Sequence, residues 1–110
     1  MKELTNQEYT EFTRTTAIYP KSRELEYLIL GLASESGEVA GKLKKVIRDQ
    51  KELNTSIKGA IIDELSDVMW YLTRLADVMG TDITGLIQIN YAKLSSRKER
   101  GVIGGSGDTR

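Results

Sequence analysis

Apolar residues recur at steps of three and four along most of the chain, which is the spacing that puts side chains on one face of an α-helix. Two long rows predict helices from about residue 23 to 48 and from about 56 to 79, and a shorter row predicts one from 83 to about 97. The rows comprise Leu25, Leu28, Leu32, Val39, Leu43 and Val46, then Ile57, Ile61, Leu65, Val68, Leu72, Leu75 and Met79, then Leu86, Ile87, Ile89, Tyr91 and Leu94. Strand-like alternation never extends beyond a few residues, so the pattern indicates an all-α fold.

Residues that cap or stop helices stand at the expected ends. Thr5 with Glu8 forms the sequence pattern of a capping box, which predicts a first helix running to about Thr16, and Pro20 separates that helix from the next. At the later boundaries the expected cap and stop residues are Ser56 or Thr55 before the third helix, Gly80 after it, and Asp82 or Thr81 before the fourth.

The length of 110 residues suits one small domain, which we place at residues 1–100, followed by a glycine-rich tail at 101–110. The two long helices carry apolar residues around more than one stripe, for example Ile29 and Ala33 in one and Met69 and Trp70 in the other. A helix with apolar residues on two faces needs cover on both. We therefore expect an all-α, four-helix bundle that is completed by oligomerisation, as a homodimer or homotetramer.

Composition narrows the chemistry that these helices can carry. Lys plus Arg equals Asp plus Glu at 16 each, and this zero net charge gives no reason to expect a nucleic-acid polymer or a membrane surface as partner. Cysteine and histidine are both absent, which excludes disulfides, thiolate nucleophiles and imidazole bases or ligands. The lack of cysteine suits a cytoplasmic protein. The polar N-terminus is unlike a signal peptide, and no apolar run approaches the roughly 20 residues of a membrane span.

Two pairs of acids interrupt the apolar rows. Glu35 fills the one gap in the row of the second helix, and Glu64 is a regular member of the row of the third. Each is followed three residues later by a second acid, Glu38 and Asp67 respectively. Positions i and i+3 lie on one helical face, so each long helix should direct two carboxylates toward its packed side.

Four carboxylates that converge inside a helical protein repel one another unless cations neutralise them. A hard divalent cation with oxygen ligands is the natural partner, and magnesium commonly combines a few carboxylates with waters and substrate phosphates. The opposing interpretation is a salt-bridge network in which Lys42, Lys45 or Arg74 neutralises the acids. Since both pairs fall within the apolar rows, a metal site is the favoured interpretation.

The segments LASESGEVAGKLKK and IIDELSDVMWYLTRLAD resemble the MazG-like nucleotide pyrophosphohydrolases, an all-α superfamily that also takes in dimeric dUTPases and dCTP pyrophosphatases. Its signature is E-x-x-E, a spacer, then E-x-x-D, which residues 35–38 and 64–67 match. A third element of the family, N-x-x-K-x-x-x-R, matches Asn90, Lys93 and Arg97. The resemblance covers about residues 8 to 100.

The resemblance implies a function and a set of roles. Glu35, Glu38, Glu64 and Asp67 would bind Mg²⁺, for which Mn²⁺ could substitute, and Asn90, Lys93 and Arg97 would contact the phosphates of a nucleoside triphosphate substrate. The implied reaction is attack of water on the α-phosphorus of an NTP or dNTP, releasing the monophosphate and pyrophosphate. Glu35 or Glu38 would also act as the base that orients the water; the residues do not decide between them.

Several further residues are candidates of a weaker kind. Tyr19 and Phe12 are expected near the nucleotide base, again by resemblance. Trp70 and Tyr71 follow the second acid pair directly and could also stack on a base, although Trp70 is better explained by core or subunit packing. The basic run formed by Lys42, Lys44 and Lys45 is typical of a solvated helix end, with phosphate contact as the alternative. Gly104 to Gly107 could form a backbone nest around phosphate, or a flexible end.

Two competing interpretations use the same acids. A di-iron carboxylate bundle needs E-x-x-H motifs, which a chain without histidine cannot supply. A non-enzymatic helical dimerisation module, whose acids only form structural networks, is the remaining alternative.

Overall fold

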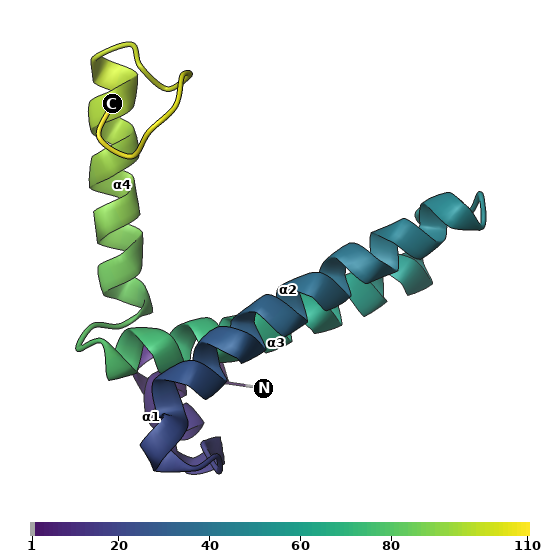
Figure 1. Cartoon of the computed structure of the whole chain (residues 1–110), viewed down its shortest axis with the longest axis horizontal. Coiled ribbons are helices and arrows are strands. Elements are labelled where there is room, and N and C mark those ends of the chain that lie inside the picture. The colour runs from purple at the N-terminus through teal and green to yellow at the C-terminus, as the bar shows by residue number, and fades with distance from the viewer. Residues whose placement is uncertain (1) are drawn as a thin grey trace.

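The computed structural model describes residues 2–110, which form helices joined by short connections, with no strand among them (Figure 1). The elements in chain order are α1 (Asn6–Thr16), the 3-10 turn η1 (Lys21–Arg23), α2 (Glu24–Arg48), α3 (Thr55–Val78) and α4 (Ile83–Glu99). The predicted all-α class with four helices is confirmed. The fourth helix extends two residues beyond the expected end near Arg97.

Most helix ends follow the predicted caps. Thr5 and Glu8 form the expected capping box at the start of α1, and the Asp82 carboxylate accepts the backbone N–H of Gly85 at the start of α4. The expectation for α3 was wrong, because Asn54 rather than Thr55 or Ser56 caps it, its side-chain oxygen accepting the Ile57 N–H at 2.9 Å. Asparagine is as good a cap as serine, and it stands one residue earlier.

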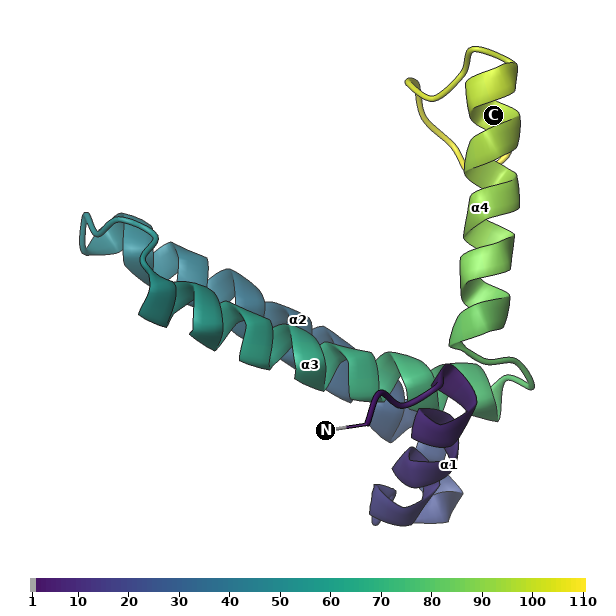
Figure 2. The same ribbon diagram turned by 180° about the vertical axis from the view of Figure 1, so that it is seen from behind.

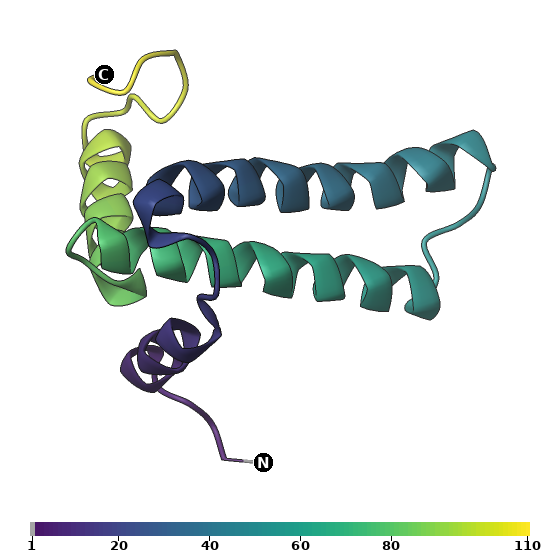
Figure 3. The ribbon, with the colours of Figure 1, turned by 60° about the horizontal axis from the view of Figure 1, so that its bottom comes forward.

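Helices α2 and α3 run antiparallel, side by side along most of their length (Figures 1 and 3). Leu28, near the start of α2, is fully buried. Six positions of the predicted row of α3 are half-buried, namely 57, 61, 64, 68, 72 and 75, whereas Leu65 and Met79 are exposed. Glu64 therefore occupies the seam between the helices as an ordinary member of that row.

A close approach between the two helices occurs one turn before Glu35. Gly31 of α2 lies directly against the aromatic ring of Tyr71 of α3, and a β-carbon at position 31 would overlap that ring. The missing side chain of Gly31 thus makes the room in which Tyr71 packs. Gly41, two to three turns further along α2, has open space around it instead.

Helix α1 is held against the end of α3 by polar contacts. Arg14 donates two hydrogen bonds to the carboxylate of Asp77, at 2.9 and 2.8 Å, and the buried Arg74 donates a third at 2.5 Å. The indole N–H of Trp70 donates to the Thr16 hydroxyl at 2.8 Å. These contacts place the end of α1 and the segment that follows it beside the C-terminal third of α3.

Helix α4 turns away from the α2–α3 pair after Gly80, whose φ of 83° closes α3 as predicted (Figures 1 and 2). It contacts α3 near the connecting turn, and its Thr84 hydroxyl accepts a hydrogen bond from the side-chain amide of Asn6 of α1 at 3.1 Å. Beyond its first turn, α4 points away from the α2–α3 pair (Figure 2). The tail at 101–110 folds back along α4, where the Arg110 guanidinium donates to the carbonyls of residues 102, 103, 104 and 107. Among residues 2–110, no helix is both long and apolar enough to span a membrane.

The contact between Gly31 and Tyr71 predicts opposite effects for two similar substitutions on α2. Gly31→Ala should lower the free energy of unfolding by about 1–3 kcal/mol, because the new methyl group overpacks against the ring. Gly41→Ala should raise it by about 0.5–1 kcal/mol, because alanine is the better helix former and meets no neighbour. Urea unfolding of both variants measures the difference, and equal effects would contradict the close approach.

The ion pairs of Asp77 predict a dependence of stability on pH. Hydrogen bonding by Arg14 and Arg74 holds the pKa of Asp77 well below its ordinary value, so the pairs stabilise the fold above about pH 4 and their contribution is lost as pH falls. Asp77→Asn should cost about 3 kcal/mol at neutral pH, since it leaves buried Arg74 unpaired, and the difference from wild type should shrink in acid. Glu99→Gln, at an exposed carboxylate, is the control.

Candidate functional site

Three of the four predicted acids meet in the seam between α2 and α3. Glu35, Glu64 and Asp67 each offer a carboxylate oxygen, and these oxygens all lie within 4.8 Å of one another. Glu35 and Glu64 are half-buried and Asp67 is exposed. Glu38, one turn beyond Glu35, is exposed and is not among the three oxygens that converge. The carboxylates of both motifs are thus brought together by the pairing of the two helices.

The electrostatics of this acid cluster show the cost of bringing the carboxylates together. Burial, followed by the negative charges of Asp67 and Glu64, raises the pKa of Glu35. The one cation of residues 2–110 that forms an ion pair with the cluster is Lys42, whose ammonium lies 3.8 Å from Glu64. One pair at this distance offsets only part of the negative charge of the three carboxylates. The repulsion that remains disfavours the ionised state of neighbouring carboxylates.

The donor set fits a hard divalent cation. All the converging ligands are carboxylate oxygens, which magnesium and calcium prefer, and no nitrogen or sulfur donor is present that would favour a softer metal. Burial is the largest cause of the raised pKa of Glu35, and the negative charges of Asp67 and Glu64 add to it, so a positive charge at this point would be favourable. Glu35, Glu64 and Asp67 could therefore hold Mg²⁺ or Mn²⁺, with Glu38 within one helical turn of them.

Aromatic side chains wall the open side of the acid cluster. Glu35, Asp67, Trp70 and Tyr71 line a cavity of about 310 Å³, and the rings of Trp70 and Tyr71 meet edge to face at 4.9 Å. Burial, the nearby hydroxyl of Tyr27 and the cluster carboxylates raise the pKa of Tyr71 to about 12. The structure thus gives Tyr71 a place in the site, one turn after Asp67.

The two N-terminal candidates for base contact lie elsewhere. Tyr19 is buried, stacked on Tyr27 with ring centroids 4.9 Å apart, and its hydroxyl donates to Glu24 at 2.5 Å. Its ring is thus already packed, although Tyr27 in turn lies 6.2 Å from Tyr71. Phe12 is exposed on α1. Neither residue lines the cavity at the acids.

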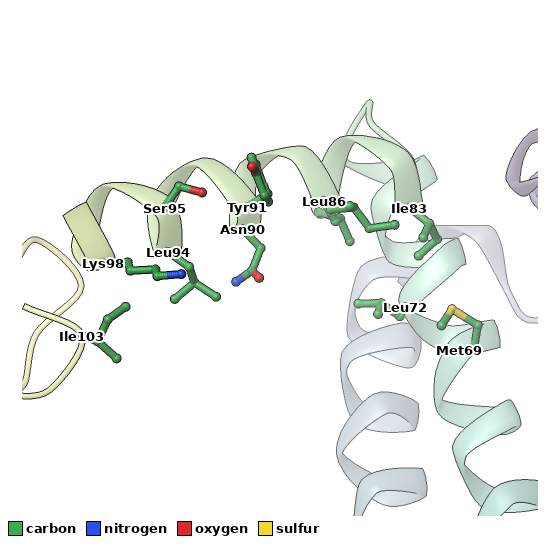
Figure 4. Close-up of a pocket in the computed structure, with 11 residues that line it drawn as sticks. Met69, Leu72, Ile83, Leu86, Asn90, Tyr91, Leu94, Ser95, Lys98 and Ile103 are labelled. Carbon is green, nitrogen blue, oxygen red and sulfur yellow. The ribbon is translucent and has the colours of Figure 1, made fainter.

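The candidates for phosphate contact on α4 do not approach the acids of the same chain. Asn90 and Lys93 are exposed, and Asn90 points into a groove of about 840 Å³ between α4 and α3 (Figure 4). Apolar side chains dominate that groove, among them Met69, Leu72, Leu86 and Leu94. Arg97 is buried beneath the tail, where its guanidinium donates to the carbonyl of Asp108 at 2.7 Å.

Sequence reasoning named two further residues of the site but not the contacts that they make. Tyr71 was named only as a residue that could stack on a base, because its position on the helix says nothing of the space at Gly31 that lets the ring reach α2. Lys42 was expected at a solvated helix end, with a salt bridge to the acids as the opposing interpretation, and the structure contains such a pair, in which the Lys42 ammonium lies 3.8 Å from Glu64. Its position one turn after Glu38 was a usable signal, since residues four apart share a face.

Comparison with known proteins agrees with this geometry. The family model of the MazG nucleotide pyrophosphohydrolase domain matches residues 23–102, a span that includes the acid cluster and all of α4. The Gene 37 protein of Mycobacterium phage L5 is 43% identical over 102 residues, which cover 86% of this chain and 90% of that protein. No solved structure matches the chain at a significant level. The chain belongs to the MazG nucleotide pyrophosphohydrolase family.

Proposed function

We propose that the protein is a magnesium-dependent nucleoside triphosphate pyrophosphohydrolase, which hydrolyses an NTP or dNTP at the α-phosphorus to the monophosphate and pyrophosphate. The observation that carries the proposal is the convergence of Glu35, Glu64 and Asp67 within 4.8 Å, inside a domain of the MazG nucleotide pyrophosphohydrolase family. The absence of cysteine suits the cytoplasm, where we place this activity in nucleotide metabolism.

The roles follow from the chemistry of the side chains. Glu35, Glu38, Glu64 and Asp67 hold the divalent ion, which when bound would neutralise the phosphates and acidify a water molecule. Glu35 or Glu38 accepts the proton of the attacking water, a task that a carboxylate within hydrogen-bond reach of that water can perform. The aromatic wall of Trp70 and Tyr71 shields one side of the acids from solvent, which strengthens charge interactions there.

We also propose that a second copy of the chain completes the site. Lys93 lies ten residues into α4, about 15 Å along a helix that leads away from the acids. The buried apolar side chains of residues 2–110 are limited to Tyr19, Leu28, Ala76 and Ile83, whereas Leu30, Ile62, Ile87 and Ile89 are more than half exposed. In a homodimer or homotetramer the groove beside α4 would be covered, and Asn90, Lys93 and Arg97 of one copy would face the acids of another.

The proposal about the acids is tested by Asp67→Asn and Glu38→Gln. Each should reduce release of pyrophosphate from a mixed nucleotide pool by at least about 100-fold, because ion binding supplies several kcal/mol of charge stabilisation. Mg²⁺ at 100 times its dissociation constant should stabilise the wild type by about 2.7 kcal/mol, and Asp67→Asn should lose most of that effect in thermal melts.

Asp63→Asn is the matched control, since Asp63 is an exposed acid of α3 outside the cluster. It should retain both turnover and stabilisation by Mg²⁺. Full activity in Asp67→Asn and Glu38→Gln would refute the assignment of the acids. If the wild type released pyrophosphate from no nucleotide and gained no stability from metal, the non-enzymatic dimerisation module would be the better account.

The oligomer is tested by a charge placed in the groove beside α4. Ile87→Glu should shift the mass measured by light scattering toward the monomer, because Ile87 lines the groove and is 56% exposed in the single chain. Ile18→Glu introduces the same charge at a residue that is 93% exposed and outside the groove, and should leave the mass unchanged. A monomeric wild type would contradict the proposal.

A further inference from the structure

A second cavity lies beside the acid cluster, toward the end of the α2–α3 pair where the two helices are connected. It measures about 170 Å³, and three of its lining residues are lysines, namely Lys42, Lys45 and Lys51. Val46 of α2 and Ile57 and Ala60 of α3 form its apolar floor. Lys42 is half-buried, whereas Lys45 and Lys51 are exposed, and all three border this one small cavity.

The turn after α2 brings Lys51 to this cavity. Gln50 has a φ of 52°, the left-handed conformation that usually requires glycine, and the N–H of Lys51 donates back to the carbonyl of Val46 at 3.0 Å. The chain thereby folds over the last turn of α2, so that Lys51 joins Lys45. A non-glycine residue in this conformation costs on the order of 1 kcal/mol. The turn that brings Lys51 to the cavity therefore forms despite the conformational cost at Gln50.

The charges at the cavity do not cancel. Asp49 also lines it, but the Asp49 carboxylate is occupied by Arg48, which donates two hydrogen bonds at 2.8 and 3.0 Å. Among residues 2–110, neither Lys45 nor Lys51 forms an ion pair with a carboxylate. The C-terminal end of α2 carries a partial negative charge, which would favour lysines there. The first turn of α3, with Ile57, lies at the same cavity, and its partial positive charge offsets that effect.

Lys42 connects this lysine cavity to the acid cluster. Its ammonium lies 3.8 Å from Glu64, and the same side chain lines the cavity. Lys42 is four residues beyond Glu38, about 6 Å along α2. A ligand whose reacting end was held at the acids would therefore extend directly toward the lysines.

We infer that the lysine cavity formed by Lys42, Lys45 and Lys51 binds the two terminal phosphates of the triphosphate whose α-phosphorus lies at the acid cluster. The inference rests on the proposed function and names the part of the site that holds the leaving group. Lysine ammonium groups are compact charges with three donors each, suited to phosphate oxygens. No residue of a second copy is needed for this contact.

Lys42 has a double role in this arrangement. While no cation is at the acids, it is the partner of Glu64 and relieves part of the repulsion within the cluster. With a divalent ion held by Glu64, the ammonium of Lys42 would be free to pair with a phosphate oxygen at the cavity. Binding of the ion and binding of the phosphates therefore favour each other.

The test is titration of the full chain with inorganic pyrophosphate in the presence of Mg²⁺, followed by calorimetry. The double variant Lys45→Ala/Lys51→Ala should bind pyrophosphate at least about tenfold more weakly than the wild type, since two charge-assisted contacts are lost. The matched control is Lys44→Ala/Lys58→Ala, which removes two exposed lysines near the same end of α2 and α3 that do not line the cavity. It should change the affinity less than twofold.

The outcomes separate the inference from the proposed function. Three results would overturn the assignment of the lysine cavity as a phosphate site. They are wild-type affinity for pyrophosphate in the double variant, an equal loss of affinity in the control, or no binding of pyrophosphate by the wild type. Turnover of nucleotides by the wild type decides the proposed function independently. If the proposed function and the lysine cavity are both correct, the double variant should raise KM for the triphosphate about tenfold. Inhibition by the monophosphate should stay unchanged, because the monophosphate lacks the two terminal phosphates.

Discussion

The mutual repulsion of the carboxylates in the α2–α3 seam is the constraint around which the rest of this structure is arranged. Glu35, Glu64 and Asp67 meet because the two longest helices pack against each other, so the packing that stabilises the fold also concentrates negative charge. The raised pKa of Glu35 records that conflict. The divalent cation that we propose for this site would offset the repulsion, and the nucleotide pyrophosphohydrolase family to which the chain belongs gives such an ion a use.

The surroundings of the acids hold this costly arrangement in place. Gly31 lets the Tyr71 ring pack against α2 one turn from Glu35, which closes the seam on that side. On the other side, Lys42 offers a positive charge to Glu64 and leads toward the lysine cavity. Along the helix pair, the aromatic rings of Trp70 and Tyr71 therefore lie on one side of the acids and the lysines lie on the other. A nucleotide has the same polarity, from base to terminal phosphate.

Helix α4 stands apart from this arrangement and gives the chain an open shape (Figure 2). Its groove is apolar, and its polar candidates lie far from the acids of their own chain. We account for both properties by a second copy that covers the groove. The lysine cavity offers a complementary source of phosphate contacts within one chain, so the two proposals divide the task between α2 and α4.

The sequence alone determined the all-α class, the two long helices and the pairing of the acids, because apolar periodicity, caps and i, i+3 spacing are local properties. It placed Glu35 and Glu64 in the seam correctly, since each stands in an apolar row. Contacts between distant residues required the tertiary structure. The fit of Tyr71 over Gly31, the pair between Lys42 and Glu64, and the departure of α4 from the bundle all depend on how helices approach one another. That approach is set by the combined shape of many side chains, which no local pattern contains.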